Sequence, residues 1–218
     1  FLEETITAFR DARYLKINNK PVLHIHHPED FDIKPFIEMG NNMAIEAGFS
    51  GITWTAPLIY VSREQEYLFD FFEGYPPGDL KFYNISRFPL LNRIYRYLIP
   101  NYLIKGKIFR LLNTFPFKNY VRKYKAYLNS VHNRYKNYIP CILTNWDNTP
   151  RYSYRGYVFR SSSPHLFHDL LQFAVNLFRD HNPPFIIIKA WNEWAEGNFL
   201  EADAEYGYER LEGIKDIK

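Results

Sequence analysis

The sequence predicts a mixed α/β protein built around parallel strands. Short apolar runs typical of buried strands alternate along the chain with amphipathic stretches typical of helices, and the segments between them are mostly short. With 218 residues, 46% of them hydrophobic, the chain can bury a sizeable core. Strands that alternate with helices favour a parallel sheet with helical crossovers. The predicted strands would form either a small open sheet or part of a (β/α)8 barrel.

The first part of the chain alternates helices and strands from its start. The first predicted strand, PVLHIHH, follows a turn at Asn18 and Asn19, and Gly48 closes the second predicted helix. In chain order we predict a helix over 1–12, a strand over 21–27, a helix over 34–48, a strand over 51–57 and a helix over 63–74.

The second part of the chain continues this alternation around a basic segment. A helix over 161–181 is predicted with Ser163 as its N-cap and Pro164 at its first position. The other predicted elements are a weaker strand over 80–85, helices over 88–98 and 119–136, strands over 139–146 and 185–191, and a last helix over 206–218.

A basic and aromatic segment lies in the middle of the chain. Between Asp79 and Asp147 there is no acidic residue, but 13 of the 27 Lys and Arg residues. We interpret 87–138 as a helical insertion in a single domain over 1–218. Its basic residues form either an ordinary solvated helix face or a surface that binds anionic partners. Those partners would be a nucleotide-sugar donor, or an anionic membrane that carries a lipid-linked acceptor. No recognised nucleic-acid-binding motif accompanies the charge, so nucleic acid is not an expected partner.

The composition also restricts where the protein is expected to act. The single cysteine, Cys141, excludes an internal disulfide, which fits a reducing compartment. The sequence shows no apolar run of transmembrane length and no signal peptide. We therefore expect a cytoplasmic protein, or one that is peripheral to the inner membrane.

Glu193 and Glu196 are the main candidates for catalytic residues. They follow the last predicted strand in AWNEWAEG, where α/β enzymes place functional groups. In one helical turn the two would face the same side, with Cβ atoms roughly 5–6 Å apart. Glycosidic chemistry requires a proton donor beside a charged carboxylate, and retaining glycosidases hold their carboxyls about 5–5.5 Å apart. The alternative is that one glutamate caps the turn or pairs with a lysine while the other is solvated.

Indole, amide and carboxylate groups flank this pair. Trp191 and Trp194 supply flat faces on which a sugar ring can stack, although either can instead be a core wedge. Asn192 can bind sugar hydroxyls or orient a glutamate, or it can be a simple turn residue. Glu201 can bind a hydroxyl or form a surface ion pair.

A second polar cluster follows the preceding strand, in NWDNTPR. Trp146, Asp147, Asn148 and Arg151 make a dense set of groups for binding hydroxyls or phosphates. The alternative is that Asp147 and Asn148 form only an Asx-type turn and that Arg151 is a surface charge.

The histidines of HIHHP are candidates for binding rather than for a metal site. His24 and His26 share one strand face, and His27 has the other. A zinc site would need a further ligand that no spacing predicts, so no metal is expected. We expect His26 and His27, near the end of the strand, to contact the substrate.

Three stretches together resemble the WbsX group of bacterial glycan-assembly proteins, which is similar to the endo-α-mannosidase-like glycoside hydrolase family 99. They are DARYLKINNKPVLHIHHPEDF, NWDNTPR, and AWNEWAEGNFLEAD followed by YGYERLE. The resemblance implies a (β/α)8 TIM-type barrel, of which this chain would supply about strands four to eight.

The resemblance also implies a mechanism. Glu193 would deprotonate the 2-hydroxyl of a sugar, which attacks the anomeric carbon to give an epoxide-like intermediate. Glu196 would act as general acid and then as base, with net retention of configuration. Two departures from the family pattern weaken a phosphate contact: His26-His27-Pro28 replaces a common Tyr-Arg-Pro, and Tyr152 replaces a common second arginine.

The sequence therefore predicts a glycosyltransferase or glycoside hydrolase that acts on glycosidic bonds in bacterial surface polysaccharide biosynthesis, of the O-antigen or rhamnan type. Its substrate would be a glycan or sugar, and the chemistry requires no metal or organic cofactor. Three alternatives stay open. The first is a non-catalytic glycan-binding protein or truncated remnant barrel, and the second is a hydrolase of mannose-containing glycans. The third is a peripheral membrane protein whose main function lies in the basic and aromatic segment.

Overall fold

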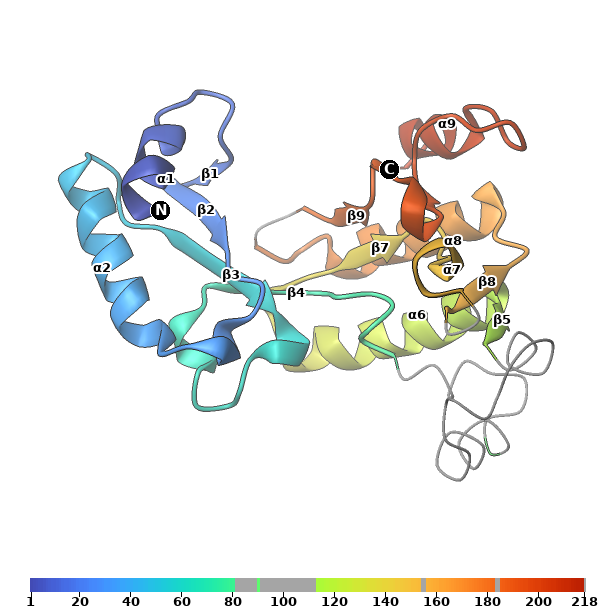
Figure 1. The fold of residues 1–218 in the computed structure, drawn as a ribbon, viewed down its shortest axis with the longest axis horizontal. Coiled ribbons are helices and arrows are strands. Elements are labelled where there is room, and N and C mark those ends of the chain that lie inside the picture. Colours follow the sequence, from blue (N-terminus) through green and yellow to red (C-terminus); the bar gives the residue numbers. More distant parts are fainter. Residues whose placement is uncertain (81–89, 91–112, 154–155, 183–184, 218) are drawn as a thin grey trace. The chain divides into compact units, whose positions relative to one another are not determined.

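A computed structural model of the chain describes residues 1–80, 90, 113–153, 156–182 and 185–217 (Figure 1). These residues form two compact units. The first consists of Phe1–Tyr75, Asn137–Ile139 and the described residues 181–182, and the second of the other described residues from Pro76 onward. Both units contain helices and parallel strands. The predicted mixed α/β class is therefore confirmed, and the described strands are distributed over four sheets rather than one.

The first unit contains a five-stranded sheet in the order β1-β2-β3-β4-β6. Strand β1 is antiparallel to β2, and all other neighbours are parallel. The elements are α1 (Leu2–Phe9), β1 (Lys16–Ile17), β2 (Lys20–His24), α2 (Ile33–Glu46), β3 (Thr53–Pro57), β4 (Phe71–Glu73) and β6 (Tyr138–Ile139), with single 3-10 turns η1 (Pro28–Asp30), η2 (Leu58–Tyr60) and η3 (Glu66–Leu68).

The core of the first unit lies between α2 and β3, whose five residues are all buried. The side-chain oxygen of Asn41 accepts hydrogen bonds from the Ile52 backbone at 2.9 Å and from the Trp54 indole at 3.1 Å. Gly40 lies directly against that indole, because a Cβ at this position would come within 2.8 Å of Trp54 Cζ2. A glycine on the buried face of α2 therefore allows the helix to pack closely on the strand.

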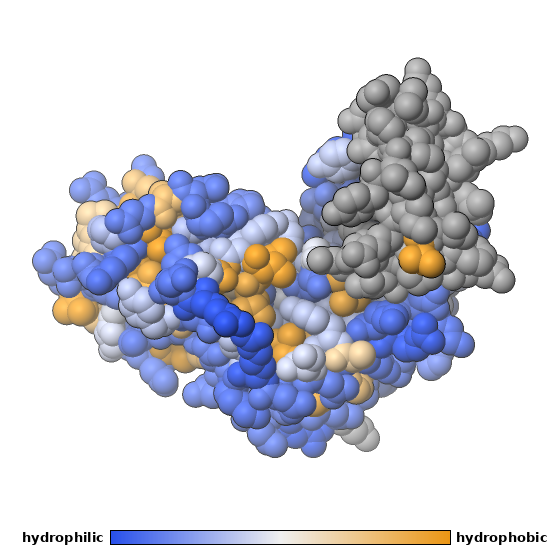
Figure 2. All heavy atoms as spheres, turned by 90° about the horizontal axis from the view of Figure 1, so that it is seen from below, coloured by the Kyte–Doolittle hydropathy of each residue, from blue (hydrophilic) through white to orange (hydrophobic). Residues whose placement is uncertain are grey.

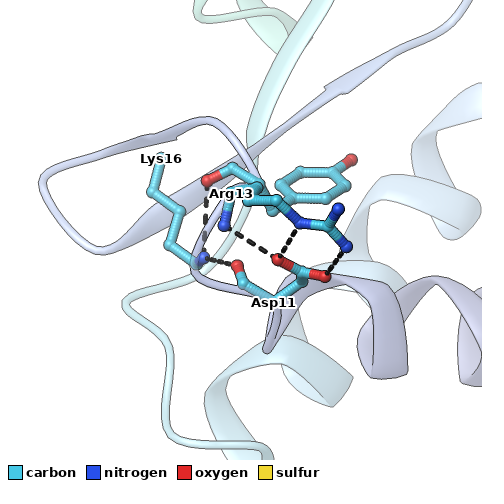
Figure 3. A network of polar contacts seen from close by, with 4 residues as sticks. Asp11, Arg13 and Lys16 are labelled. Carbon is cyan, nitrogen blue, oxygen red and sulfur yellow. Dashed lines mark hydrogen bonds and ion pairs between the residues drawn. The ribbon is translucent and has the colours of Figure 1, made fainter.

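Surface charges close the turn between α1 and β1 (Figure 3). The carboxylate of Asp11 accepts hydrogen bonds from the Arg13 guanidinium, the shorter at 2.7 Å, and Lys16 Nζ donates to the Asp11 carbonyl at 2.8 Å. The hydrogen bonds from Arg13 lower the pKa of Asp11 to about 2. Because these groups are exposed, they order the turn more than they stabilise the fold.

The helix predicted over 63–74 is wrong. Glu66–Leu68 forms a single 3-10 turn, and Phe71–Glu73 forms β4, which pairs with both β3 and β6. Aromatic residues suit a strand at least as well as a helix. The two parallel neighbours therefore decide the state of this segment.

The second unit contains three pairs of strands and two long helices. Strand β7 is parallel to β9, β5 is parallel to β8, and β10 is antiparallel to β11. The elements are β5 (Thr114–Pro116), α6 (Phe117–Arg134), β7 (Cys141–Leu143), α7 (Thr149–Tyr152), β8 (Val158–Arg160), α8 (Pro164–Phe178), β9 (Ile187–Lys189), β10 (Asn192–Glu193), the 3-10 turn η6 (Trp194–Glu196), β11 (Asn198–Phe199) and α9 (Glu209–Lys215).

Helix α8 begins as predicted and packs against α6. The Ser163 side chain accepts a hydrogen bond from the Leu166 backbone at 3.4 Å, and Pro164 occupies the first helical position. Lys125 of α6 forms an ion pair with Asp169 of α8 at 2.8 Å. The buried face of α6 consists of apolar and tyrosine residues, and that of α8 of apolar residues.

About half of the predicted basic insertion over 87–138 lies outside the described residues. Of the helix predicted over 88–98 only Leu90 is described, and the strand predicted over 80–85 is described only at Leu80. The helix predicted over 119–136 corresponds to α6, whose basic side chains at Lys118, Arg122 and Lys123 are exposed. The role of this segment toward an anionic membrane stays a prediction.

The face of the described residues that is visible in Figure 2 is mainly polar. Hydrophilic side chains cover most of the visible described face, and hydrophobic side chains appear as separate patches between them (Figure 2). Within the described ranges, no helix combines the length and the apolar composition that a membrane span requires.

Candidate active site

The candidate site of the second unit lies where β7 and β9 end. The two strands are parallel and in register, with Leu143 opposite Lys189. Their carboxyl ends therefore lie at the same sheet edge, and the polar segments 144–151 and 190–201 both leave from that edge.

Backbone contacts hold these two segments together. The Asp147 N–H donates to the Glu196 carbonyl at 2.7 Å, and the Thr144 N–H donates to the Lys189 carbonyl at 3.1 Å. Gly197 has φ +57°, and a Cβ at this position would lie 2.9 Å from Asp147 Cβ. Both the backbone conformation and the close approach therefore require glycine after Glu196.

The two candidate catalytic glutamates lie at the start and the end of a single 3-10 turn. Glu193 is the last residue of β10 and the N-cap of η6, and Glu196 is the last residue of η6. The expected α-helical turn is thus replaced by a strand end and a 3-10 turn, in which residues three apart lie nearly in line. Both glutamates are partly buried, and the Glu196 side chain is only 15% exposed.

Arg151 connects the second polar cluster to this turn. Its Nη1 lies 3.2 Å from Glu196 Oε1, and its own side chain is 52% exposed. Helix α7, which begins directly after Asn148, carries the guanidinium to the carboxylate. Arg151 is thus an exposed charge that forms an ion pair with a candidate catalytic group.

The tryptophans differ in how they can contact a ligand. Trp191 is 56% exposed and Trp194 is 47% exposed, but the Trp194 ring stacks on Phe199 with centroids 3.7 Å apart. The Trp194 indole N–H donates to Glu201 Oε2 at 2.7 Å. Glu201 therefore fixes the plane of Trp194, and Trp191 is the more exposed indole.

Trp146 is buried, with 7% exposure, and so it has no open face for stacking on a sugar. Lys189 Nζ lies 5.1 Å from the centre of its ring, a distance suited to a cation–π contact. In this arrangement Trp146 packs against Lys189, the last residue of β9. The direct contact of Trp146 with a ligand stays a prediction.

Asp147 and Asn148 shape the loop through their own hydrogen bonds. Asp147 Oδ1 accepts from the backbone N–H of Thr149 at 2.9 Å and from the Thr149 hydroxyl at 2.5 Å. Asn148 is 8% exposed, and its Oδ1 accepts from the Tyr157 N–H at 2.7 Å. Asp147 therefore forms an Asx-type turn, as in the alternative interpretation of this loop. Asn192, in contrast, is exposed.

Sequence reasoning missed Asn198, which is fully buried beside the site. Its side-chain amide lies 2.9 Å from Thr144 Oγ1 and can donate to the carbonyl oxygens of Asn145 and Lys189. Asn198, the first residue of β11, thereby connects this strand to the ends of β7 and β9. Its position directly after the required glycine was the only signal in the sequence.

Sequence reasoning also missed a buried ion pair behind the site. Asp203 binds Arg210 of α9, and both side chains are at most 10% exposed. Burial alone would raise the pKa of Asp203, but the backbone N–H groups of Tyr206 and Glu205 and the Arg210 guanidinium together lower it. The Arg210 guanidinium also lies 5.6 Å from the ring centre of Phe199, on which Trp194 stacks.

His26 and His27 belong to the first unit. His27 Nδ1 lies 3.0 Å from Glu29 Oε1, and this hydrogen bond lowers the pKa of Glu29. The rings of His26 and Tyr75 have centroids 5.1 Å apart. Among the described residues, no group of three or more His, Cys, Asp or Glu could hold a metal ion.

The chain is similar to proteins known from sequence and from structure. It is 40% identical over 80 residues to the "Uncharacterized protein WxcX" of Xanthomonas campestris pv. campestris, in strains B100 and ATCC 33913. The aligned stretch is 35% of this chain and 11% of WxcX. A solved "Glycoside hydrolase-like protein" matches with a TM-score of 0.60 and 16% identity, over all of this chain and 59% of that protein. This likeness shows a shared fold, and in both comparisons the match spans less than two thirds of the other protein.

The family model described as "Glycosyltransferase WbsX" matches residues 1–214, which is nearly the whole chain. This match confirms the resemblance seen in the three sequence stretches. The chain belongs to the WbsX glycosyltransferase family.

Proposed function

We propose that the protein makes or breaks glycosidic bonds of a bacterial surface polysaccharide, with Glu193 and Glu196 as its two catalytic carboxylates. One observation carries the proposal. Two polar clusters that are about 45 residues apart in sequence meet at Glu196, through the Arg151 ion pair at 3.2 Å and the Asp147 backbone hydrogen bond at 2.7 Å. Arg151 holds the carboxylate of Glu196 and Asp147 holds its backbone carbonyl. A glutamate fixed in this way at a strand end is suitably placed for acid–base chemistry.

The proposed reaction moves one proton at each glutamate. Glu193 takes the proton of the sugar 2-hydroxyl, and the 2-oxygen attacks the anomeric carbon. Glu196 gives its proton to the departing glycosidic oxygen, so the bond breaks and a three-membered ring forms. Glu196 then takes a proton from an incoming hydroxyl, whose oxygen opens this ring with net retention of configuration. The 2-oxygen recovers its proton from Glu193.

The incoming hydroxyl decides between the two reaction types. Water gives hydrolysis, and the hydroxyl of a second sugar gives transfer. The family name supports transfer, while the fold shared with a glycoside hydrolase-like protein is compatible with hydrolysis. We propose that the donor, a nucleotide sugar or a glycan, binds against the exposed Trp191 and Asn192.

The same comparisons support a barrel. We assign the parallel strands of the chain to part of a (β/α)8 barrel, because the likeness to the glycoside hydrolase-like protein extends over the whole chain. In such a barrel, catalytic groups lie at the carboxyl ends of the strands, which is where Glu193 and Glu196 are found.

The experiment follows both reaction products. Purified protein is incubated with mannose-containing and rhamnose-containing glycans, alone and with nucleotide sugars, and new reducing ends and elongated glycans are measured. We expect Glu193→Gln and Glu196→Gln to lose activity by at least about 10²-fold. Glu209→Gln, an exposed glutamate of α9, serves as the matched control and should keep full activity. If all four proteins behave alike, the site is not catalytic, and glycan binding without turnover becomes the function to test.

A further inference from the structure

An imidazole–carboxylate pair lies at the carboxyl edge of the five-stranded sheet in the first unit. His24 is the last residue of β2, and Glu73 is the last residue of β4. Thr55 of β3 lies between them, opposite His24 in the parallel register. Because carboxyl ends of parallel strands are where α/β proteins place their ligands, this cluster is positioned for binding.

Glu73 is a fixed anchor in this cluster. Its Oε2 lies 3.0 Å from His24 Nδ1, and its Oε1 accepts a hydrogen bond from the Thr55 hydroxyl. The Glu73 side chain is 15% exposed, and Thr55 is fully buried. Since both carboxylate oxygens are engaged, Glu73 orients its neighbours and is not the group that contacts a ligand.

The anchor determines which nitrogen of His24 faces a ligand. A carboxylate only accepts hydrogen bonds, so Nδ1 of His24 carries the proton that points to Glu73. In the neutral ring Nε2 is then an acceptor. The His24 side chain is 39% exposed, and its Nε2 has no hydrogen-bond partner in the described part of the chain. This nitrogen can therefore accept a hydrogen bond from a ligand hydroxyl.

Aromatic rings lie beside this acceptor. The ring of His26 lies 5.8 Å from that of His24 and 5.1 Å from that of Tyr75, and the rings of Tyr60 and Tyr75 are 5.4 Å apart. Flat aromatic faces next to an oriented acceptor suit the apolar face and the hydroxyl rim of a sugar ring. The negative charge of Glu73 disfavours a phosphate at the same place.

We propose that the cluster of His24, Glu73, Tyr60 and Tyr75 is a subsite for a neutral pyranose ring of the glycan. His24 Nε2 accepts a hydrogen bond from a sugar hydroxyl, Glu73 holds the imidazole in the required tautomer, and the tyrosines contact the ring. The subsite rests on the proposed function, which supplies the glycan. It adds His24 and the carboxylate anchor to the predicted contacts of His26 and His27.

Nuclear magnetic resonance of the histidine rings tests the subsite without any change at His24. The probes are neutral oligosaccharides of α-linked mannose or rhamnose, added to the Glu193→Gln/Glu196→Gln protein so that turnover does not interfere. Long-range proton–nitrogen spectra should show His24 protonated at Nδ1, and one of the probes should shift its Nε2 resonance. Exposed His165 of α8 is the internal control and should not shift.

Variants give the second measurement. We expect His24→Ala and Glu73→Gln to weaken binding of the responding oligosaccharide at least tenfold, with the same far-UV circular dichroism as the parent protein. The matched controls His165→Ala and Glu64→Gln, both at exposed positions, should bind as the parent does.

The outcomes separate this subsite from the proposed function. A shift at His24 without any turnover by the wild type would keep the subsite and remove the catalytic proposal. Turnover together with an unmoved His24 resonance, or with unchanged binding by folded His24→Ala, would overturn the subsite alone. Absence of binding by every probe would overturn the subsite as well.

Discussion

Glu196 is the residue at which the separate features of the candidate site converge. It ends the 3-10 turn, its backbone carbonyl accepts the Asp147 N–H, and its carboxylate pairs with Arg151. None of these contacts is local in sequence, so they depend on the parallel register of β7 and β9. The side chains that surround a proposed sugar are thus positioned by strand pairing rather than by the motif alone.

Arg151 should act by orienting Glu196. We expect Arg151→Ala to lower kcat about 10-fold to 100-fold with a smaller change in KM, because a carboxylate displaced by about 1 Å loses that much rate. Arg151→Lys should recover part of the loss, since lysine keeps the charge but not the planar donor geometry. Arg160→Ala, at an exposed position at the end of β8, is the control. Equal kcat for Arg151→Ala and wild type would show that the ion pair has no role in turnover.

Asp203 should make stability depend on pH in the acid range. Its pKa is lower in the folded than in the unfolded state, so its contribution is present above the unfolded value of about 3.9 and is lost as the pH falls through the folded value. At pH 7 we expect Asp203→Asn to lower the free energy of unfolding by roughly 3 kcal/mol, because it leaves a buried arginine without its partner.

Urea unfolding at pH 7 and at pH 3 measures this difference. The gap between wild type and Asp203→Asn should narrow at pH 3, which lies below the unfolded-state pKa of about 3.9, because the unfolded wild type then binds a proton at Asp203 that the folded state, with its lowered pKa, binds less readily. Asp11→Asn removes the exposed ion pair with Arg13 and should change stability little at pH 7. A gap that is the same at both pH values would mean that the charge of Asp203 does not stabilise the fold.

Among the elements, the hairpin of β10, η6 and β11 determines the geometry of the glutamates. Asn192 pairs with Phe199 and Glu193 pairs with Asn198, and η6 is the connection between the two strands. Buried Asn198 attaches this hairpin to the ends of β7 and β9. A change in the connection should therefore affect both catalytic candidates together.

Two glycines of this region provide a matched test. Gly197 and Gly207 have nearly the same φ, +57° and +54°, but a Cβ at Gly197 meets Asp147 at 2.9 Å while a Cβ at Gly207 meets nothing within 4 Å. We expect Gly207→Ala to lower the free energy of unfolding by about 1–2 kcal/mol. Gly197→Ala should lower it by about 1–3 kcal/mol more because of the added clash. Thermal or urea unfolding checks this, and equal losses would show that the 144–151 segment moves freely away from η6.

The sequence predicted elements best where local chemistry determines the structure. Helix α8 has its cap and its proline as expected, and β3 is the buried strand that TWTAP indicated. The prediction over 63–74 was wrong because pairing with two neighbouring strands outweighed a helical pattern. The contact of Trp194 with Phe199 and the burial of Asn198 also depend on tertiary packing, which no motif encodes.

For the molecule as a whole, family membership and fold rest on different evidence. The family model extends over 1–214, while the likeness to the glycoside hydrolase-like protein, at 16% identity, concerns the fold. Both agree with strands whose carboxyl ends carry the polar groups of each unit, Glu193 and Glu196 in one and His24 and Glu73 in the other. The proposed chemistry uses the two carboxylates of Glu193 and Glu196.

The most direct test is to measure kcat/KM for the wild type, Glu193→Gln, Glu196→Gln and the double variant on the glycan that responds. If the two glutamates act as one catalytic unit, the double variant should lose about as much activity as the more damaged single variant, since such effects are strongly non-additive. Losses that simply multiply, or single variants that keep wild-type activity, would contradict a catalytic pair in the turn of Glu193 and Glu196.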